Sequence, residues 1–197
     1  MLSVFLGSIV VSPIHGQTTT LSGNISTITD IPMADVTIQL MIGESIFTTT
    51  TDEQGDYILE SIPNLTDVQI QFTKEDDPVN GVSSLDLVLM SRHILGIAPF
   101  KTSDKYLAMD VNKSGTLTAF DFVQIRRLIL GLATEFPNND AWRFVEKGRL
   151  ANITINQTDN PEYTGAINTP FSLENEDAIV LNFTGIKVGD ASRNAIP

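Results

Sequence analysis

Short runs of alternating apolar and polar residues characterise the first third of the chain. In residues 36–41 valine, isoleucine and leucine alternate with threonine, glutamine and methionine, and residues 68–72 repeat the alternation. A period of two places one set of side chains on a single face of a β-strand. Residues 52–55 form an expected turn between two further strand-like runs. The pattern therefore predicts a small β-sandwich over residues 18–74.

From residue 76 to residue 133 the pattern becomes helical and repeats itself. LDLVLMSRHILGIA at residues 85–98 aligns with FDFVQIRRLILGLA at residues 120–133. In the second copy, apolar residues recur at the three- and four-residue spacing of an amphipathic helix. Gly96 and Gly131 follow these runs, where glycine commonly ends a helix. Two such helices can bury their apolar stripes against each other, which predicts one small domain at residues 75–134.

A loop rich in oxygen-bearing side chains precedes the second helix. DVNKSGTLTAFD at residues 110–121 has side-chain oxygens at positions 1, 3, 5 and 12, and glycine at position 6. Such a loop can wrap a Ca²⁺ ion, which takes about six to eight oxygen ligands. The expected metal ligands are Asp110, Asn112, Ser114, the carbonyl of Thr116, and Asp121. The alternative is an ordinary turn in which Asp121 serves only as a negative charge at the helix N-terminus.

An imperfect copy of this loop precedes the first helix. Gly81 aligns with Gly115, but one residue is missing before the terminal aspartate, and Pro78 occupies a ligand position. We still expect calcium here. The expected ligands are Asp76 or Asp77, Asn80, the carbonyl of Val82, and Asp86. The alternative is a capping box between Ser83 and Asp86 with no ion. An entering helix is expected only before the second loop, at residues 104–109 after a Ser103 cap.

The chain returns to a β pattern after residue 135. Residues 142–145 and 151–155 are expected strands, and residues 157–170 are an expected loop. Residues 179–183 alternate, and residues 186–188 are expected to continue that strand. These strands are too few for an isolated sheet. We therefore expect residues 135–197 to form a β-rich tail that packs on the preceding units, within an α+β fold.

Charge and composition narrow the range of functions. The chain has 24 acidic and 12 basic residues, a net charge of −12 and no cysteine. Nucleic-acid binding is not expected, because phosphate contacts need a basic face. Disulfides, thiolate metal sites and cysteine nucleophiles are excluded.

Residues 1–17 suit either a truncated signal peptide or a buried first strand, and their apolar run is too short for a membrane span. His93, alone in the first helix, is expected at a surface or boundary rather than as a catalytic base.

Two resemblances add to this picture. SGNISTITDIPMADVTIQL and TTTTDEQGDYILESIPN resemble the carboxypeptidase-regulatory-like or Cna-B-type family of immunoglobulin-like modules, which are usually spacers or stalks and sometimes sugar-binding surfaces. DVNKSGTLTAFDFVQIRRLILGL and DDPVNGVSSLDLVLMSRHILGI resemble a type I dockerin domain, in which two calcium loops are each followed by an exit helix (an F-hand pair). The dockerin resemblance implies two calcium ions and docking onto a cohesin-type protein module in bacterial secreted or cell-surface assemblies, notably those degrading polysaccharides.

The dockerin resemblance also implies positions of partner contact. They are Ser84, Leu85, Ser91 and Arg92 in the first copy, and Ala119, Phe120, Arg126 and Arg127 in the second. The Ser/Thr pair common in the family is replaced here by Ser-Leu and Ala-Phe. This departure and the short first loop set the chain apart from the usual pattern.

Three functions remain open on this reading. The leading hypothesis is a non-catalytic, extracellular calcium-binding module that docks other proteins, with carbohydrate as a further candidate ligand. The second is a stalk or adhesin segment that calcium stiffens without a docking partner. The third is an accessory region of a secreted polysaccharide-degrading enzyme. Catalysis within these residues is not expected, because the acidic residues cluster in loops that calcium or solvent explains.

Overall fold

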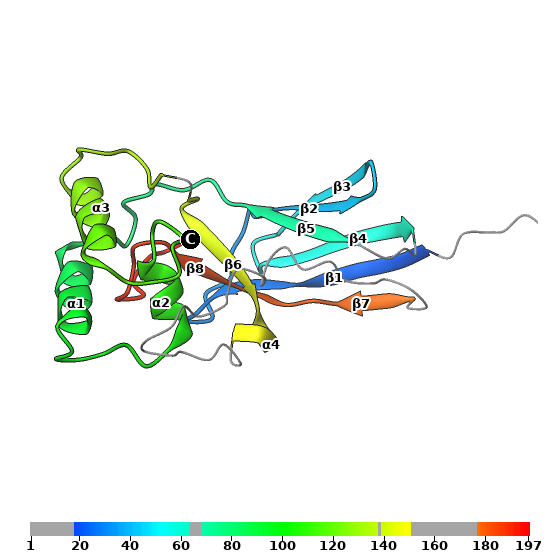
Figure 1. Ribbon diagram of the computed structural model, residues 1–197. Coiled ribbons are helices and arrows are strands. Elements are labelled where there is room, and N and C mark those ends of the chain that lie inside the picture. The colour runs from blue at the N-terminus through cyan, green and yellow to red at the C-terminus, as the bar shows by residue number, and fades with distance from the viewer. Residues whose placement is uncertain (1–17, 64–67, 138, 151–176) are drawn as a thin grey trace, which may run out of the picture.

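The computed structural model describes residues 18–63, 68–137, 139–150 and 177–197. The expectations for residues 1–17, 151–155 and 157–170 lie outside this part. The elements in chain order are β1 (Thr18–Thr27), β2 (Thr37–Ile42), β3 (Ser45–Thr50), β4 (Asp56–Pro63), β5 (Gln69–Thr73), α1 (Ser84–Ile94), α2 (Ser103–Met109), α3 (Ala119–Ile129), β6 (Trp142–Glu146), α4 (Lys147–Leu150), β7 (Ala178–Val180) and β8 (Phe183–Lys187). The expected α+β class is confirmed, with strands extending from one side of the molecule and α1, α2 and α3 gathered at the other (Figure 1).

Two sheets carry the β part. One has the order β4-β1-β8-β6, with β7 also paired to β1, and the other has the order β3-β2-β5. The long strand β1 pairs in parallel with β7 through Leu21 opposite Ile179, and further along with β8 through Ile25 opposite Phe183. Strands from the end of the chain therefore complete a sheet that begins at residue 18.

The single strand expected over residues 179–188 is wrong, because two separate strands lie there: β7 ends at Val180, and β8 begins at Phe183 and ends at Lys187. Between them, the carbonyl of Leu181 accepts a hydrogen bond from the Tyr57 hydroxyl at 2.8 Å. The Asn182 side chain accepts one from the backbone N–H of Asn24 at 2.9 Å. The Leu181 N–H also donates to the carbonyl of Ser22 at 2.9 Å, so residues 181 and 182 remain bonded to β1 and β4 between the two strands.

A first hydrophobic core fills the space between the sheets. In β2 alternate residues are buried, as the period of two predicts, and Ile38 and Leu40 are fully buried. Phe72 on β5 lies between Phe144 and Phe183, with ring centroids 5.1 and 4.5 Å apart. The aromatic side chains of β6 and β8 thus join this core to the end of the chain.

A second core lies under the helices. Val82, Met90, Ile125 and Leu128 are buried there, as expected for two helices packed on each other. Strand and tail residues also contribute to it, namely Val145, Ile186, Val188 and Ala191. The helices therefore pack on β6 and β8, which lie between them and the other strands (Figure 1).

The helix ends agree in part with those expected from the sequence. Gly96 and Gly131 have φ values of 67° and 66°, in the left-handed conformation expected of helix-ending glycines. The Ser103 cap of α2 is wrong, because the helix begins at Ser103 itself and the N-cap residue Thr102 makes no side-chain capping bond. The Ser103 hydroxyl instead donates to the carbonyl of Leu150 at 3.0 Å.

Candidate calcium-binding loops

The second loop runs from the end of α2 to the start of α3 and winds around Asp110. The Asp110 carboxylate is fully buried and accepts backbone N–H bonds from Ser114 at 3.0 Å and Gly115 at 2.8 Å. Lys113 and Gly115 both have positive φ, at 58° and 82°. At Gly115 this conformation favours glycine. The sharp turn expected at position 6 is therefore present.

Three more of the expected ligands lie in the same hydrogen-bonded loop. The side-chain oxygen of Asn112 accepts the Ser114 N–H at 2.9 Å. The Ser114 hydroxyl donates to the carbonyl of Thr116 at 3.1 Å. Asp110, Asn112, Ser114 and Thr116 are thus close neighbours, and each offers an oxygen of the kind that calcium prefers.

Asp121 closes the loop, and its two oxygens have different surroundings. Oδ2 accepts bonds from the N–H and hydroxyl of Thr118, both at 3.0 Å, which completes a capping box at the start of α3. Oδ1 is buried and has no hydrogen-bond partner among the described residues. Burial raises the pKa of Asp121 and the negative charge of Asp110 raises it further, against the hydrogen bonds from Thr118 and the nearby backbone N–H of Asn112, which lower it. The capping role therefore uses one oxygen and leaves the other for a cation.

Arg143 on β6 holds the beginning of this loop, and the sequence analysis did not identify it. Its guanidinium donates to the carbonyl of Leu107 at 2.9 Å and to the carbonyl of Asp110. Asn139 adds a bond to the carbonyl of Val111 at 3.0 Å. The available signal was an arginine between the large apolar residues Trp142 and Phe144 in an expected strand. Arg143 fixes the backbone at the start of the second loop.

The first loop is arranged differently at its first position. Asp76 Oδ2 is 2.7 Å from the ammonium of Lys187 and accepts the indole N–H of Trp142 at 2.7 Å. The Asn80 amide also donates to Asp76, at 3.2 and 3.1 Å to its two oxygens. Burial alone would raise the pKa of Asp76, but the hydrogen bonds from Lys187 and Trp142 outweigh it and lower that pKa.

The remaining expected ligands of the first loop contact the chain itself. Asp86 Oδ2 forms a capping box with Ser83, and Oδ1 accepts the backbone N–H of Ser192 at 2.8 Å. The Asp77 side chain accepts the N–H of Val79 at 2.9 Å, and its carbonyl accepts a bond from Lys187 at 2.7 Å. Val82 is buried in the second core. Lys187 and Ser192 were not predicted, because nothing in the spacing links them to residues more than a hundred positions away.

The expected partner-contact positions lie on α1 and α3, mostly exposed. Leu85 and Phe120, equivalent in the two copies, are 51% and 60% exposed. Val88 and Val123, also equivalent, are 53% and 49% exposed, and the sequence analysis did not include them. The remaining exposed positions are Ser84, Arg92, Ala119, Arg126 and Arg127. Ser91 is half-buried, and its hydroxyl donates to the carbonyl of Leu87 at 2.8 Å.

His93 lies at a boundary, as expected, and stacks on Phe100 with ring centroids 4.6 Å apart. Its Nδ1 accepts the backbone N–H of Phe100 at 3.0 Å, so it supports the α1–α2 connection.

Among the described residues, no group of three or more His, Cys, Asp or Glu side chains could hold a metal ion. The second loop has two carboxylates and would draw its other oxygens from amide, hydroxyl and carbonyl groups. No helix in the described part is long and apolar enough to cross a membrane.

One comparison with known proteins matches the helical segment. Residues 79–130 match the family model for the dockerin type I domain, which covers about a quarter of the chain and includes the whole second loop. The match supports the dockerin resemblance for this segment and does not reach the preceding strands. Dockerin domains are non-catalytic modules that interact with cohesin modules, and type I domains typically bind Ca²⁺ and are typically extracellular or at the cell surface. The match therefore favours a protein–protein docking role for this segment.

The other comparisons contribute little. No curated protein matches the chain. Among solved structures, the crystal structure of a 9R-lipoxygenase from Cyanothece PCC8801 is similar at 14% identity and a TM-score of 0.22. The similarity covers 35% of this chain and 12% of that one. A similarity at this TM-score carries no argument about fold or activity.

Proposed function

We propose that this chain is a non-catalytic, extracellular calcium-binding module that docks a cohesin-type protein through α1 and α3. The observation that carries the proposal is the buried, unpartnered Oδ1 of Asp121, located in the segment that matches the dockerin type I family. A buried carboxylate oxygen without a partner is costly. Calcium would offset that cost and would be held by Asp110, Asn112, Ser114, the Thr116 carbonyl and Asp121.

Calcium binding would be coupled to the order of α3. Asp110 and Asp121 are both fully buried, and the negative charge of the first disfavours ionisation of the second. A divalent cation between the two ends of the loop supplies positive charge that lets both carboxylates ionise. Because the metal-binding geometry exists only in the folded chain, the binding free energy contributes to folding. Calcium thereby fixes α3 beside α1.

The two exit helices would provide the docking face. The exposed apolar side chains of Leu85, Val88, Phe120 and Val123 occupy equivalent positions in the two copies. Exposed arginines at residues 92, 126 and 127 lie on the same helices. Exposed apolar side chains flanked by charged ones are typical of a protein interaction surface. The two-sheet part would then act as an immunoglobulin-like spacer.

The first test is thermal unfolding with and without calcium. We expect about 10 mM calcium to raise the Tm by about 3–10 °C over EDTA, since a Kd of about 10⁻⁴–10⁻³ M corresponds to roughly 1.4–2.7 kcal/mol. Asp110→Asn and Asp121→Asn should each remove this increase. Glu135→Gln, at an exposed residue outside the loop, is the control that should retain it. An unchanged Tm in EDTA for the unmodified chain would contradict the calcium proposal.

A stalk that calcium stiffens without docking a partner is a second candidate. It is favoured by the way β6 and β8 contribute to both cores, because a helical unit built on the sheet would be stiffened as a junction. The two functions differ in binding. Docking predicts saturable, calcium-dependent capture of a cohesin-type domain from a purified panel, whereas the stalk predicts calcium-dependent stability with no capture.

A further inference from the structure

The first loop holds a cation that the chain itself supplies. Lys187 is 2% exposed at its side chain, and its ammonium contacts Asp76 Oδ2 and the Asp77 carbonyl, each at 2.7 Å. Asp76 occupies the first ligand position of the loop, and Asp110 occupies the equivalent position of the second loop. We infer that the first loop binds no calcium, because the ammonium of Lys187 and the C-terminal tail take up the oxygens that an ion would need.

At the first ligand position, the positive charge is already provided. Asp76 accepts hydrogen bonds from Lys187, from the Trp142 indole and from the Asn80 amide. Trp142 and Lys187 are directly opposite each other on β6 and β8, so their side chains reach the same carboxylate from one face of the sheet. A calcium ion at Asp76 would have to displace these donors and would be repelled by the buried ammonium.

At the last ligand position, the two loops provide an internal comparison. Asp86 and Asp121 both use Oδ2 in a capping box. The Oδ1 of Asp121 has no partner among the described residues, whereas the Oδ1 of Asp86 accepts the backbone N–H of Ser192 at 2.8 Å. The same atom is therefore open in one copy and occupied by the tail in the other.

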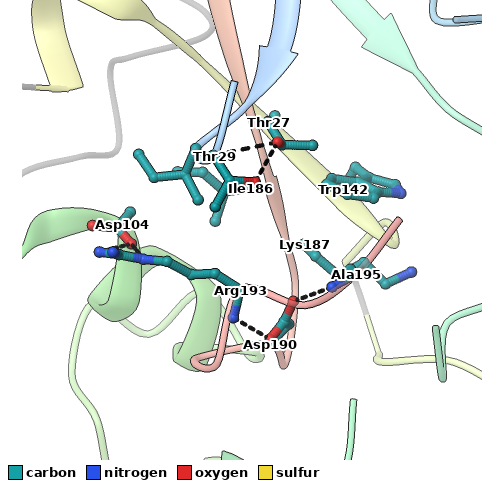
Figure 2. Close-up of a pocket in the computed structure, with 11 residues that line it drawn as sticks. Thr27, Thr29, Asp104, Trp142, Ile186, Lys187, Asp190, Arg193 and Ala195 are labelled. Carbon is teal, nitrogen blue, oxygen red and sulfur yellow. Dashed lines mark hydrogen bonds and ion pairs between the residues drawn. The ribbon is translucent and has the colours of Figure 1, made fainter. Parts of the chain in front are cut away.

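The tail that occupies the first loop is held by its own turn. Figure 2 shows Asp190 bonded to the backbone N–H groups of Arg193 and Ala195, at 2.6 and 2.9 Å, while Arg193 reaches Asp104 on α2 at 2.7 Å. Gly81 meets Ala195 so closely that a Cβ at residue 81 would lie 2.5 Å from the Ala195 Cβ. The loop glycine thus makes room for the tail as well as for the turn.

The fifth-position residue is also engaged by the tail. The Asn80 amide donates to the carbonyl of Ile196 at 2.6 Å as well as to Asp76. Its nitrogen, rather than its oxygen, thus faces the carboxylate that would begin a metal site. With Pro78 at the third position, the first three ligand positions of the loop provide no free side-chain oxygen to an ion. Only one half of the pair therefore responds to calcium.

Calorimetric calcium titration of the full chain tests this inference. We expect one ion per chain in the unmodified protein and in Asp76→Asn, and none in Asp110→Asn. Two ions per chain, or one ion retained by Asp110→Asn, would overturn the inference. No ion in the unmodified protein would refute the proposed calcium site of the second loop while agreeing with a first loop that binds none, so the two proposals fail separately.

Amide hydrogen exchange of the unmodified chain provides a second measurement that does not depend on variants folding. The N–H groups of Ser83 and Ser192 bond to Asp86, whereas those of Ser114 and Gly115 bond to Asp110. Replacing calcium with EDTA should change the exchange rates of the Ser83 and Ser192 amides by less than about twofold. It should increase the exchange rates of the Ser114 and Gly115 amides by about tenfold or more. Equal loss of protection in both loops would contradict a first loop that is independent of calcium.

Discussion

Two buried cations on neighbouring strands distinguish the two loops. Lys187 on β8 contacts a carboxylate of the first loop, whereas Arg143 on β6 donates to the backbone carbonyls of Leu107 and Asp110 at the start of the second. A cation bonded to backbone carbonyls fixes the course of the loop at that point. Arg143 therefore positions the backbone of the second loop, while Lys187 compensates the charge of Asp76 in the first loop.

Replacing Arg143 should weaken calcium binding without removing any ligand. Arg143→Met keeps much of the buried stem but loses the bonds to the carbonyls of Leu107 and Asp110. Residues that orient metal ligands typically change affinity by about 10–100-fold when replaced, so we expect the calcium Kd measured by calorimetry to rise at least about tenfold. Arg149→Met, at a half-exposed arginine of α4, is the matched control and should change the Kd less than about twofold. Equal effects of both substitutions would contradict the positioning role.

At the scale of elements, the sequence predicts what is local. The spacing of residues 110–121 and the two glycines at the helix ends anticipate the second loop and the ends of α1 and α3, because each depends on residues close in the chain. The contacts of Asp76 and Asp86 are not predictable in this way. They depend on the pairing of β6 with β8 and on a turn at Asp190, which bring Lys187 and Ser192 across 111 and 106 positions.

The repeated helices also expose the same apolar positions, which gives the docking proposal a direct test. Leu85→Ser and Phe120→Ser should each reduce capture of a cohesin-type domain by about tenfold or more, since large side chains at an interface centre carry much of the binding free energy. The Tm should change by no more than about 2 °C, because both side chains are more than half exposed. Ile46→Ser on β3, at a residue 62% exposed, is the control that should leave capture intact. Retained capture by both helix variants would place docking elsewhere.

For the whole molecule, β6 and β8 unite the parts that the sequence separates into modules. Alternation along β6 places Trp142 and Phe144 in the first core and Val145 in the second. β8 divides in the same way, with Phe183 in the first core and Ile186 in the second. Both cores thus extend across residue 134, as expected of a tail that packs on the preceding units, whereas among the described residues neither core joins residues 18–74 to residues 75–134.

This sharing of strands predicts that the helical segment does not fold by itself. A fragment of residues 75–134 would lack Val145, Ile186, Val188 and Ala191 of the second core, and also the partners of Asp76 and Asp86. Losing several large buried side chains at about 1.5–3 kcal/mol each exceeds the stability expected of so short a chain. Even in 10 mM calcium, a concentration at or above the Kd of about 10⁻⁴–10⁻³ M expected of an extracellular site, circular dichroism should show no cooperative melting of the fragment, while the full chain melts cooperatively. A fragment of residues 75–197, which retains the tail, should recover part of the transition. Cooperative melting of the short fragment within a few degrees of the full chain would show instead that α1, α2 and α3 are stable without β6 and β8.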